Sequence, residues 1–283
     1  MLGGMFSTIG RTFGLMKTSW RILMQDRSLV LFPILSGVTL LLLMLVFAGV
    51  GATTGTLARL TALEGGAGAA MTPLDIAVSF TFLVLAYAVA ITFNAALVAS
   101  ALERLRGDAP TIQRGLRAAT AHLPAILGWA IIAATVGLIL SALRGRSDNN
   151  FAGRLAVGLV GGVWAYVTFF VVPVLVVEGL GPIGAIRRSS TLFRSTWGNQ
   201  AVAGFGFGLV YVAAALVAFL PGALLYTVSP ALGILVGVLA VSLAFAVIMA
   251  LEGIFKAALY QFARGENAGA FEAGTLRAAY RAL

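Results

Sequence analysis

The feature that most constrains this sequence is the absence of charged side chains over long stretches. The longest such run extends from Ser195 to Leu251 and contains no Asp, Glu, Lys or Arg. It is too long for one membrane span, because about 20 helical residues cross a hydrocarbon layer of about 30 Å. Pro221 and Pro230 divide it, since proline disfavours a continuous helix. We therefore expect two spans here, near Gln200–Leu220 and Ala231–Leu251.

Four earlier uncharged runs each have the length of one more span: the apolar core Leu29–Val50, and the stretches between Asp75 and Glu103, between His122 and Arg144, and between Arg154 and Glu178. Hydrophobic residues make up 60% of the chain and charged residues 10%, and the mean hydropathy is +1.01. This composition is typical of integral membrane proteins. The sequence predicts an all-α polytopic protein with six transmembrane helices. Between the first two spans, Gly51–Pro73 is predicted to be a small-residue loop without a packing face.

Three basic amphipathic segments are expected to form helices in the membrane interface, each before a pair of spans. They lie around Gly14–Trp20, Gly115–Leu123 and Ala185–Trp197. The predicted apolar stripes are Ile112, Leu116, Ala119 and Leu123 in the second and Ile183, Ile186, Phe193 and Trp197 in the third.

This alternation predicts a threefold pseudo-repeat of interfacial helix plus two-helix hairpin, over about 6–107, 108–182 and 183–265. The repeats form a single membrane domain, 1–265, followed by a short cytoplasmic tail, 266–283. Within it, we expect Pro173 to break the fourth span, which ends at Glu178 before a Gly179–Pro182 turn. Glycines four residues apart, Gly233 and Gly237, and also Gly158, Gly161 and Gly162, are expected to allow close helix packing.

Five segments carry a resemblance to a known family: SWRILMQDRSLVLFPILSG, FNAALVASALERLRG, LPAILGWAIIAATVGL, FFVVPVLVVEGLGPIGAIRRSSTLFRSTWG and ALYQFARGE. Together they resemble an uncharacterised family of prokaryotic six-span membrane proteins with a domain of unknown function. The central segment is also distantly similar to the membrane domain attached to some bacterial glycerophosphodiester phosphodiesterases. This sequence has no segment like their soluble catalytic domain, so the resemblance does not imply phosphodiesterase activity. It implies a location in a bacterial or archaeal cell (inner) membrane.

The residue types disfavour catalysis. The chain has no cysteine and one histidine, His122, so thiolate chemistry and histidine metal clusters are excluded. The ten acids are expected in loops or at span ends, whereas an intramembrane enzyme needs partnered polar groups inside a span. We therefore expect that the protein is not an enzyme and that it has no catalytic residues, no metal and no cofactor.

Asn94 is the deepest strongly polar side chain expected within a span. Two interpretations remain open for it. It either hydrogen-bonds to a neighbouring helix and holds the bundle together, or it lines a cavity.

A second candidate site lies on the cytoplasmic side, where each even-numbered span is expected to end in an acid. We expect these acids and nearby cations to form a polar ring and to contact lipid headgroups. Lys256 follows the third acid at the i,i+4 spacing of a helical ion pair. The candidate residues are Glu103, Arg117, Glu178, Arg187, Arg188, Arg194, Glu252 and Lys256.

Two functions fit these features. The first is a non-enzymatic membrane protein that contacts lipids, which we expect to be anionic, or a membrane partner through its cytoplasmic-side interfacial helices. The alternative is a transporter or channel-like protein for a lipid or other apolar small molecule. A cavity beside Asn94 would favour the alternative, and solid packing there would favour the first. A homo-oligomer fits either function, whereas nucleic-acid binding is not expected despite the net charge of +9.

Basic residues in short loops predict that both termini are cytoplasmic, because such loops carry most of the Lys and Arg on that side. Reporter fusions at Gly66 and at the carboxyl terminus should therefore report opposite sides of the membrane. Finding both reporters on one side would contradict the predicted topology.

Overall fold

The computed structural model describes residues 16–64, 70–147, 151–197, 207–266, 271 and 276. Every regular element in these ranges is a helix, as the sequence predicted. After a helix over residues 16–25, the elements are η1 (Arg27–Val30), α2 (Leu31–Thr54), α3 (Thr56–Glu64), α4 (Pro73–Leu105), α5 (Ile112–Thr120), α6 (Leu123–Ser147), α7 (Phe151–Thr168), α8 (Val171–Val177), α9 (Pro182–Trp197), α10 (Phe207–Tyr226) and α11 (Pro230–Ala263).

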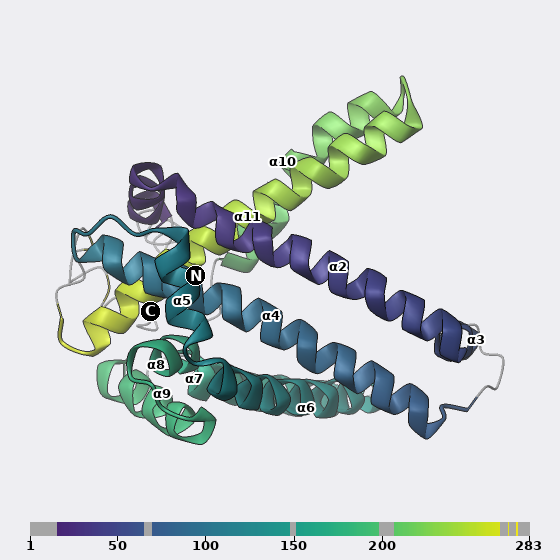
Figure 1. The fold of residues 1–283 in the computed structure, drawn as a ribbon, viewed down its shortest axis with the longest axis horizontal. Helices are drawn as coiled ribbons and strands as arrows, with labels where there is room; N and C mark the ends of the chain where they lie inside the picture. Colours follow the sequence, from purple (N-terminus) through teal and green to yellow (C-terminus); the bar gives the residue numbers. More distant parts are fainter. Residues whose placement is uncertain are drawn as a thin grey trace.

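Five helical segments among the described residues are long and apolar enough to cross a membrane. They are Arg27–Thr54, Pro73–Leu105, Leu123–Gly145, Ala152–Val177 and Pro230–Ala263. The shorter apolar helix α10 packs along α11 and forms a hairpin with it. The chain is therefore a multi-pass membrane protein. In Figure 1 the long helices diverge from one end of the molecule, and the α10–α11 hairpin extends away from α2 and α4.

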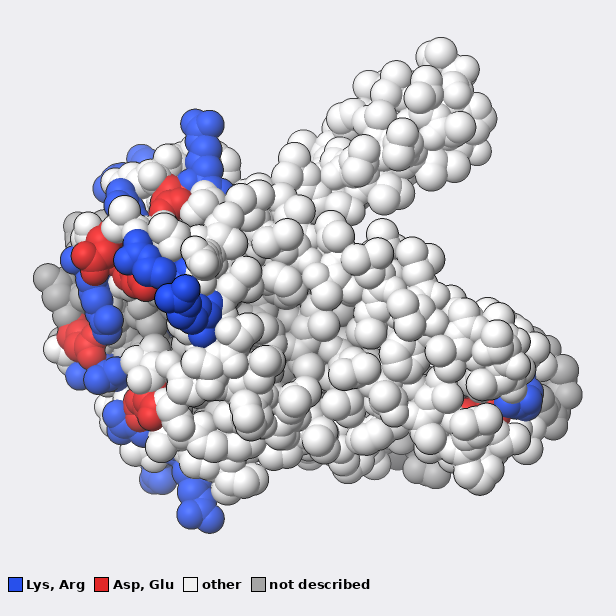
Figure 2. Space-filling view, viewed as in Figure 1, with Lys and Arg blue, Asp and Glu red and all other residues white. Residues whose placement is uncertain are grey.

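The buried core lies at the end from which the helices diverge. It is built from the second half of α11, the second half of α4, and α8, with Ile254, Leu259, Val98 and Leu175 all fully buried. Figure 2 shows that Lys, Arg, Asp and Glu gather at this end, whereas the diverging helices are uncharged apart from a small charged spot near α3. These helices expose many large hydrophobic side chains. The other halves of the spans therefore present apolar side chains for contact with lipid.

The fourth span is broken, but one turn earlier than predicted. The helix is interrupted at Phe169 and Phe170, between α7 and α8, and Pro173 lies inside α8. Pro173 has no N–H for the carbonyl group four residues before it and its ring crowds that carbonyl, which accounts for a break at this position. The freed N–H of Phe170 donates to the Oγ of Ser189 on α9 at 2.9 Å. Both residues are fully buried, so α9 supplies the hydrogen-bond partner that the broken span lacks.

The predicted turn after α8 is confirmed, and α5 and α9 are helices. Gly179 has a φ of +64° and α9 begins at Pro182, where proline has no N–H to leave unpaired. The predicted stripe of α9 is partly wrong, because Ile183 is 55% exposed. The buried side chains of α9 lie on one face of the helix, and this face is shifted by one residue from the one that contains Ile183. They are Ala185, Ser189, Leu192 and Phe193.

Helix α5 lies very close to α4 at Gly115. A Cβ atom at Gly115 would overlap the Oγ of Ser100, and it would lie 2.8 Å from Cζ of Phe32 and 2.9 Å from the carbonyl oxygen of Ala96. Only glycine fits this position. Arg114 and Arg117 lie on the exposed side of α5.

The prediction of a small-residue loop without a packing face over Gly51–Pro73 is wrong for residues 51–64, and residues 65–69 lie outside the described part of the chain. Helix α2 continues to Thr54 and α3 follows directly after Gly55. Arg59 of α3 makes two hydrogen bonds to the buried carboxylate of Asp75 at the start of α4, at 2.6 and 2.8 Å. These side-chain hydrogen bonds raise the pKa of Arg59. Thr72 caps α4 by accepting a hydrogen bond from the Asp75 N–H at its hydroxyl oxygen, and the Asp75 carboxylate accepts from the N–H and hydroxyl groups of Thr72, so one acid fixes the hairpin at this end.

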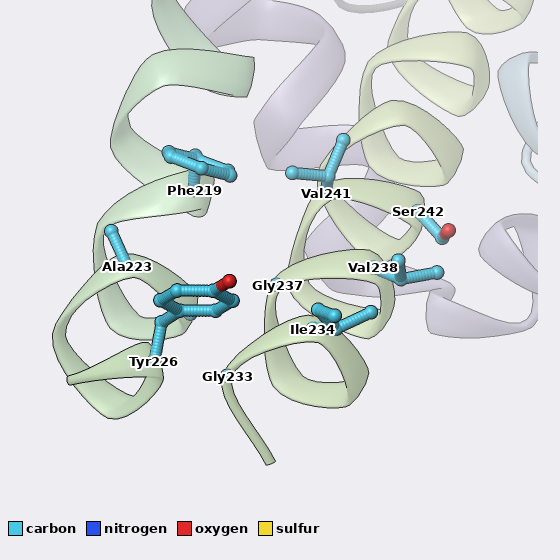
Figure 3. Close-up of a pocket in the computed structure, with 10 residues that line it drawn as sticks. Phe219, Ala223, Tyr226, Gly233, Ile234, Gly237, Val238, Val241 and Ser242 are labelled. Carbon is cyan, nitrogen blue, oxygen red and sulfur yellow. The ribbon is translucent and has the colours of Figure 1, made fainter. Parts of the chain in front are cut away.

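Glycine pairs bring α10 and α11 together, as predicted for Gly233 and Gly237. Gly222 of α10 lies against Gly237 of α11. A Cβ atom added to Gly222 would clash with the backbone of Gly237. Figure 3 shows this contact region, in which apolar side chains of the two helices surround a hollow of about 580 Å³. The prediction that Pro221 ends a span is wrong, because α10 continues past it to Tyr226.

The glycines of α7 behave differently. Among the described residues, an added Cβ at Gly158, Gly161 or Gly162 would meet nothing within 4 Å, so the expected close packing is not found there.

Replacing Gly115 by Ala should lower the thermal midpoint of the protein in detergent, because the added methyl group overpacks the α4–α5 contact at a cost of about 1–3 kcal/mol. Gly158→Ala is the matched control. It adds the same methyl group to a helix in open space, where Ala stabilises relative to Gly by about 0.5–1 kcal/mol. Equal midpoints for the two variants would contradict the close contact at Gly115.

Candidate functional site

A cavity of about 410 Å³ lies where α4, α6, α7, α8 and α11 meet. Its volume is within the range of small-molecule binding sites, about 300–1,000 Å³. Asn94 lines it, together with residues that bring both apolar and polar groups. The other lining residues are Val98, Trp129, Ala165, Thr168, Phe169, Val172, Pro173, Glu252, Phe255 and Lys256.

The position of the cavity along the spans follows from helix geometry. At 1.5 Å per residue, Asn94 is about 32 Å from the start of α4 at Pro73, and Glu252 is about 33 Å from the start of α11 at Pro230. Both side chains therefore lie toward the charged end of the molecule, about one hydrocarbon thickness of 30 Å along the helix from the opposite ends of α4 and α11. The cavity also opens to the outside beside α7, because Ala165 both lines it and is exposed.

Glu252 is not at the end of its helix, which corrects the prediction. Helix α11 continues to Ala263, about three turns further. Glu252 forms the predicted i,i+4 ion pair with Lys256, with 2.7 Å between Oε1 and Nζ. Its other carboxylate oxygen accepts a hydrogen bond from the hydroxyl group of Tyr211 on α10 at 3.0 Å. Lys256 Nζ also lies 5.7 Å from the centroid of the Phe169 ring, at the break between α7 and α8.

The Asn94 side chain lines the same cavity as this ion pair. Its Oδ1 atom is buried and has no hydrogen-bond partner among the described residues. An unpartnered buried acceptor costs about 1–3 kcal/mol, so a ligand or water that donates a hydrogen bond here would be stabilised. The hydroxyl group of Thr168, a further polar lining residue, is already bonded to the carbonyl oxygen of Trp164 at 2.7 Å.

Glu178 belongs to a separate group of polar residues that joins α8, α9 and α11. Its carboxylate accepts two hydrogen bonds from Nε of Arg188, at 2.9 and 3.1 Å, and one from the hydroxyl group of Tyr260 at 2.9 Å. The Arg264 guanidinium lies 3.5 Å from that hydroxyl oxygen. This group holds α9 against the core and therefore positions Ser189.

The remaining candidates do not form a continuous ring in the part of the chain that the structure describes. Glu103 contacts Arg114 at 3.9 Å rather than Arg117, and Arg117 is exposed on α5. Arg187 and Arg194 are exposed on α9. The three acids are thus found in three separate pairs, and only the pair of Glu252 lies at the cavity.

Sequence reasoning missed the aromatic partners of the acids, Tyr211 and Tyr260. Each lies 41 or more residues from its acid in the chain, so no local spacing indicates the contact. The described residues contain no cluster of three or more His, Cys, Asp or Glu side chains suited to a metal ion. The chemistry of the cavity is that of hydrogen bonds and one ion pair beside aromatic and aliphatic surface.

Replacing Asn94 by Leu should leave the thermal midpoint in detergent unchanged or slightly higher, because the variant removes an acceptor that has no partner. Ser189→Ala is the contrasting control. It removes the hydrogen bond that the buried N–H of Phe170 donates to Ser189 and should cost about 1–3 kcal/mol. A fall for Asn94→Leu as large as that for Ser189→Ala would show that Asn94 holds helices together instead.

Comparison with known proteins gives one assignment. No curated protein and no solved structure matches this sequence. Residues 74–270, more than half of the chain, match the family described as a family of unknown function, DUF6159. The matched region extends from the start of α4 to beyond the end of α11, and so includes every residue that lines the cavity. The chain belongs to the DUF6159 family.

Proposed function

We propose that this protein is a non-enzymatic membrane protein that takes up a lipid or other amphiphilic small molecule in the cavity beside Asn94, as a transporter-like protein does. The observation that supports the proposal is the cavity itself, which combines an unpartnered acceptor, an ion pair and apolar walls. An amphiphile needs both kinds of surface. The depth of the cavity matches the boundary between headgroups and hydrocarbon, where such a molecule already resides.

The opening beside α7 gives a route from the membrane. A lipid that enters sideways keeps its chains in hydrocarbon while its headgroup moves into the cavity, so the charged group never crosses apolar surface. The break between α7 and α8 forms part of the wall, and irregular backbone at membrane depth is tolerated where it lines a cavity.

In this proposal α10 is the sixth span and the charged end of the molecule is cytoplasmic. The described part of α10 is apolar throughout and packs along α11. Helix α5 precedes two long helical segments and α9 precedes the α10–α11 hairpin, which supports the repeated unit of interfacial helix and hairpin. Lys and Arg gather at the charged end of the molecule (Figure 2), which favours the cytoplasmic side of a prokaryotic cell membrane for that end.

A second candidate function is contact with anionic lipids or a membrane partner through the short basic helices. The exposed side chains of Arg117, Arg187 and Arg194 favour it, since each such charge contributes about 1 kcal/mol of attraction to an anionic leaflet. The two functions are compatible. They differ in where a retained lipid is bound.

A cavity-filling variant separates them. Ala165→Phe puts a ring into the cavity, whereas Ala156→Phe adds the same ring to another exposed position of α7 that does not line it. Ala165→Phe should reduce the lipid that co-purifies, as measured by mass spectrometry, by about tenfold or more, because overpacking a site costs about 1–3 kcal/mol. Ala156→Phe should retain the wild-type amount. Equal retention by both variants would place the lipid on the surface and favour the second candidate.

A further inference from the structure

The charges that line the cavity cancel. Of its lining residues, only Glu252 and Lys256 have an acidic or basic side chain, and these two are paired with each other at 2.7 Å. A headgroup with a net negative charge would enter without a net opposite charge to stabilise it. In a headgroup with one positive and one negative charge, the positive charge can face Glu252 and the negative charge can face Lys256.

The free hydrogen-bonding capacity specifies the ligand further. A lysine ammonium has three N–H donors. The ammonium group of Lys256 contacts the Glu252 carboxylate and the Phe169 ring. These two contacts leave at least one N–H donor for an acceptor such as phosphate. Asn94 offers an acceptor, Oδ1, that lacks a donor. The ligand should therefore bring an anionic oxygen for Lys256 and an N–H group for Asn94.

We propose that the cavity takes the headgroup of a zwitterionic phospholipid whose ammonium retains N–H donors, as phosphoethanolamine does. This inference rests on the proposed function and names the ligand class of the same site. The phosphate faces Lys256, and the ammonium lies between Glu252 and Asn94. The aromatic and aliphatic walls at Trp129 and Phe255 accommodate the glycerol backbone and the start of the chains. A trimethylated ammonium has no N–H and would leave the oxygen of Asn94 unpaired.

The test compares three phospholipids with identical acyl chains and ethanolamine, choline or glycerol headgroups. Each is added to the purified full-length protein in detergent, and the bound fraction is measured by native mass spectrometry. The wild type should retain the ethanolamine lipid about tenfold better than the choline lipid, which is the effect of one hydrogen bond to a charged group. It should also retain the ethanolamine lipid better than the anionic glycerol lipid.

Glu252→Gln tests the charge argument directly. The amide can still accept from Tyr211, but Lys256 is left uncompensated, so the preference should shift toward the anionic glycerol lipid. Glu266→Gln is the matched control, because Glu266 pairs with Arg106 and Arg264 away from the cavity and its loss should leave the ranking unchanged. If Glu252→Gln does not fold, the wild-type ranking alone decides.

The outcomes separate the two levels of the proposal. If the wild type prefers the glycerol or choline lipid and Ala165→Phe abolishes that binding, the cavity binds lipid but the zwitterionic assignment is wrong. If Ala165→Phe leaves the retention of all three lipids unchanged, the proposed function itself fails.

Discussion

The second half of α11 is the surface on which the rest of the molecule is assembled. Its small and apolar side chains from Ile254 to Leu259 are almost entirely buried except at Lys256, and α2, α4, α9 and α10 all pack against this helix. Burial is concentrated at the charged end, where water supplies a hydrophobic driving force for packing. Within lipid that force is absent, because the hydrocarbon chains are as apolar as the side chains. The spans are therefore joined at one end and diverge from there.

The cavity is a consequence of this arrangement. It forms at the edge of the core, where the break at Phe169 turns the chain and where α7 and α11 no longer fill the space beside Asn94. Polar groups are costly at the centre of a bilayer but much less so near the headgroups. A site with an ion pair and an amide can thus exist at this depth without a soluble domain to enclose it. At this depth, amphiphilic molecules of the membrane can reach the cavity.

The sequence allowed the long helices to be predicted, because a charge-free run of span length has few alternatives in any fold. It also indicated the broken span, the two short basic helices and the Glu252–Lys256 pair, each of which depends on residues close in the chain. Features that depend on distant residues were missed or misplaced. Helix α3 is held by the pair of Arg59 with Asp75, the register of α9 by its contact with the core, and the partner of Glu252 by the packing of α10. From the sequence, a cavity beside Asn94 was one of two open interpretations. It could not be chosen there because the cavity depends on how five helices pack in space.

The hydrogen bond from Phe170 to Ser189 has a consequence for how the chain is inserted during synthesis. When α7 and α8 first reach the membrane, the residue that accepts the Phe170 N–H is still 19 positions away in the chain. A buried N–H without a partner costs about 1–3 kcal/mol, so the broken fourth span gains stability once α9 has been made and has folded back against it. The break thus ties the stability of the fourth span to a helix that is synthesised after it.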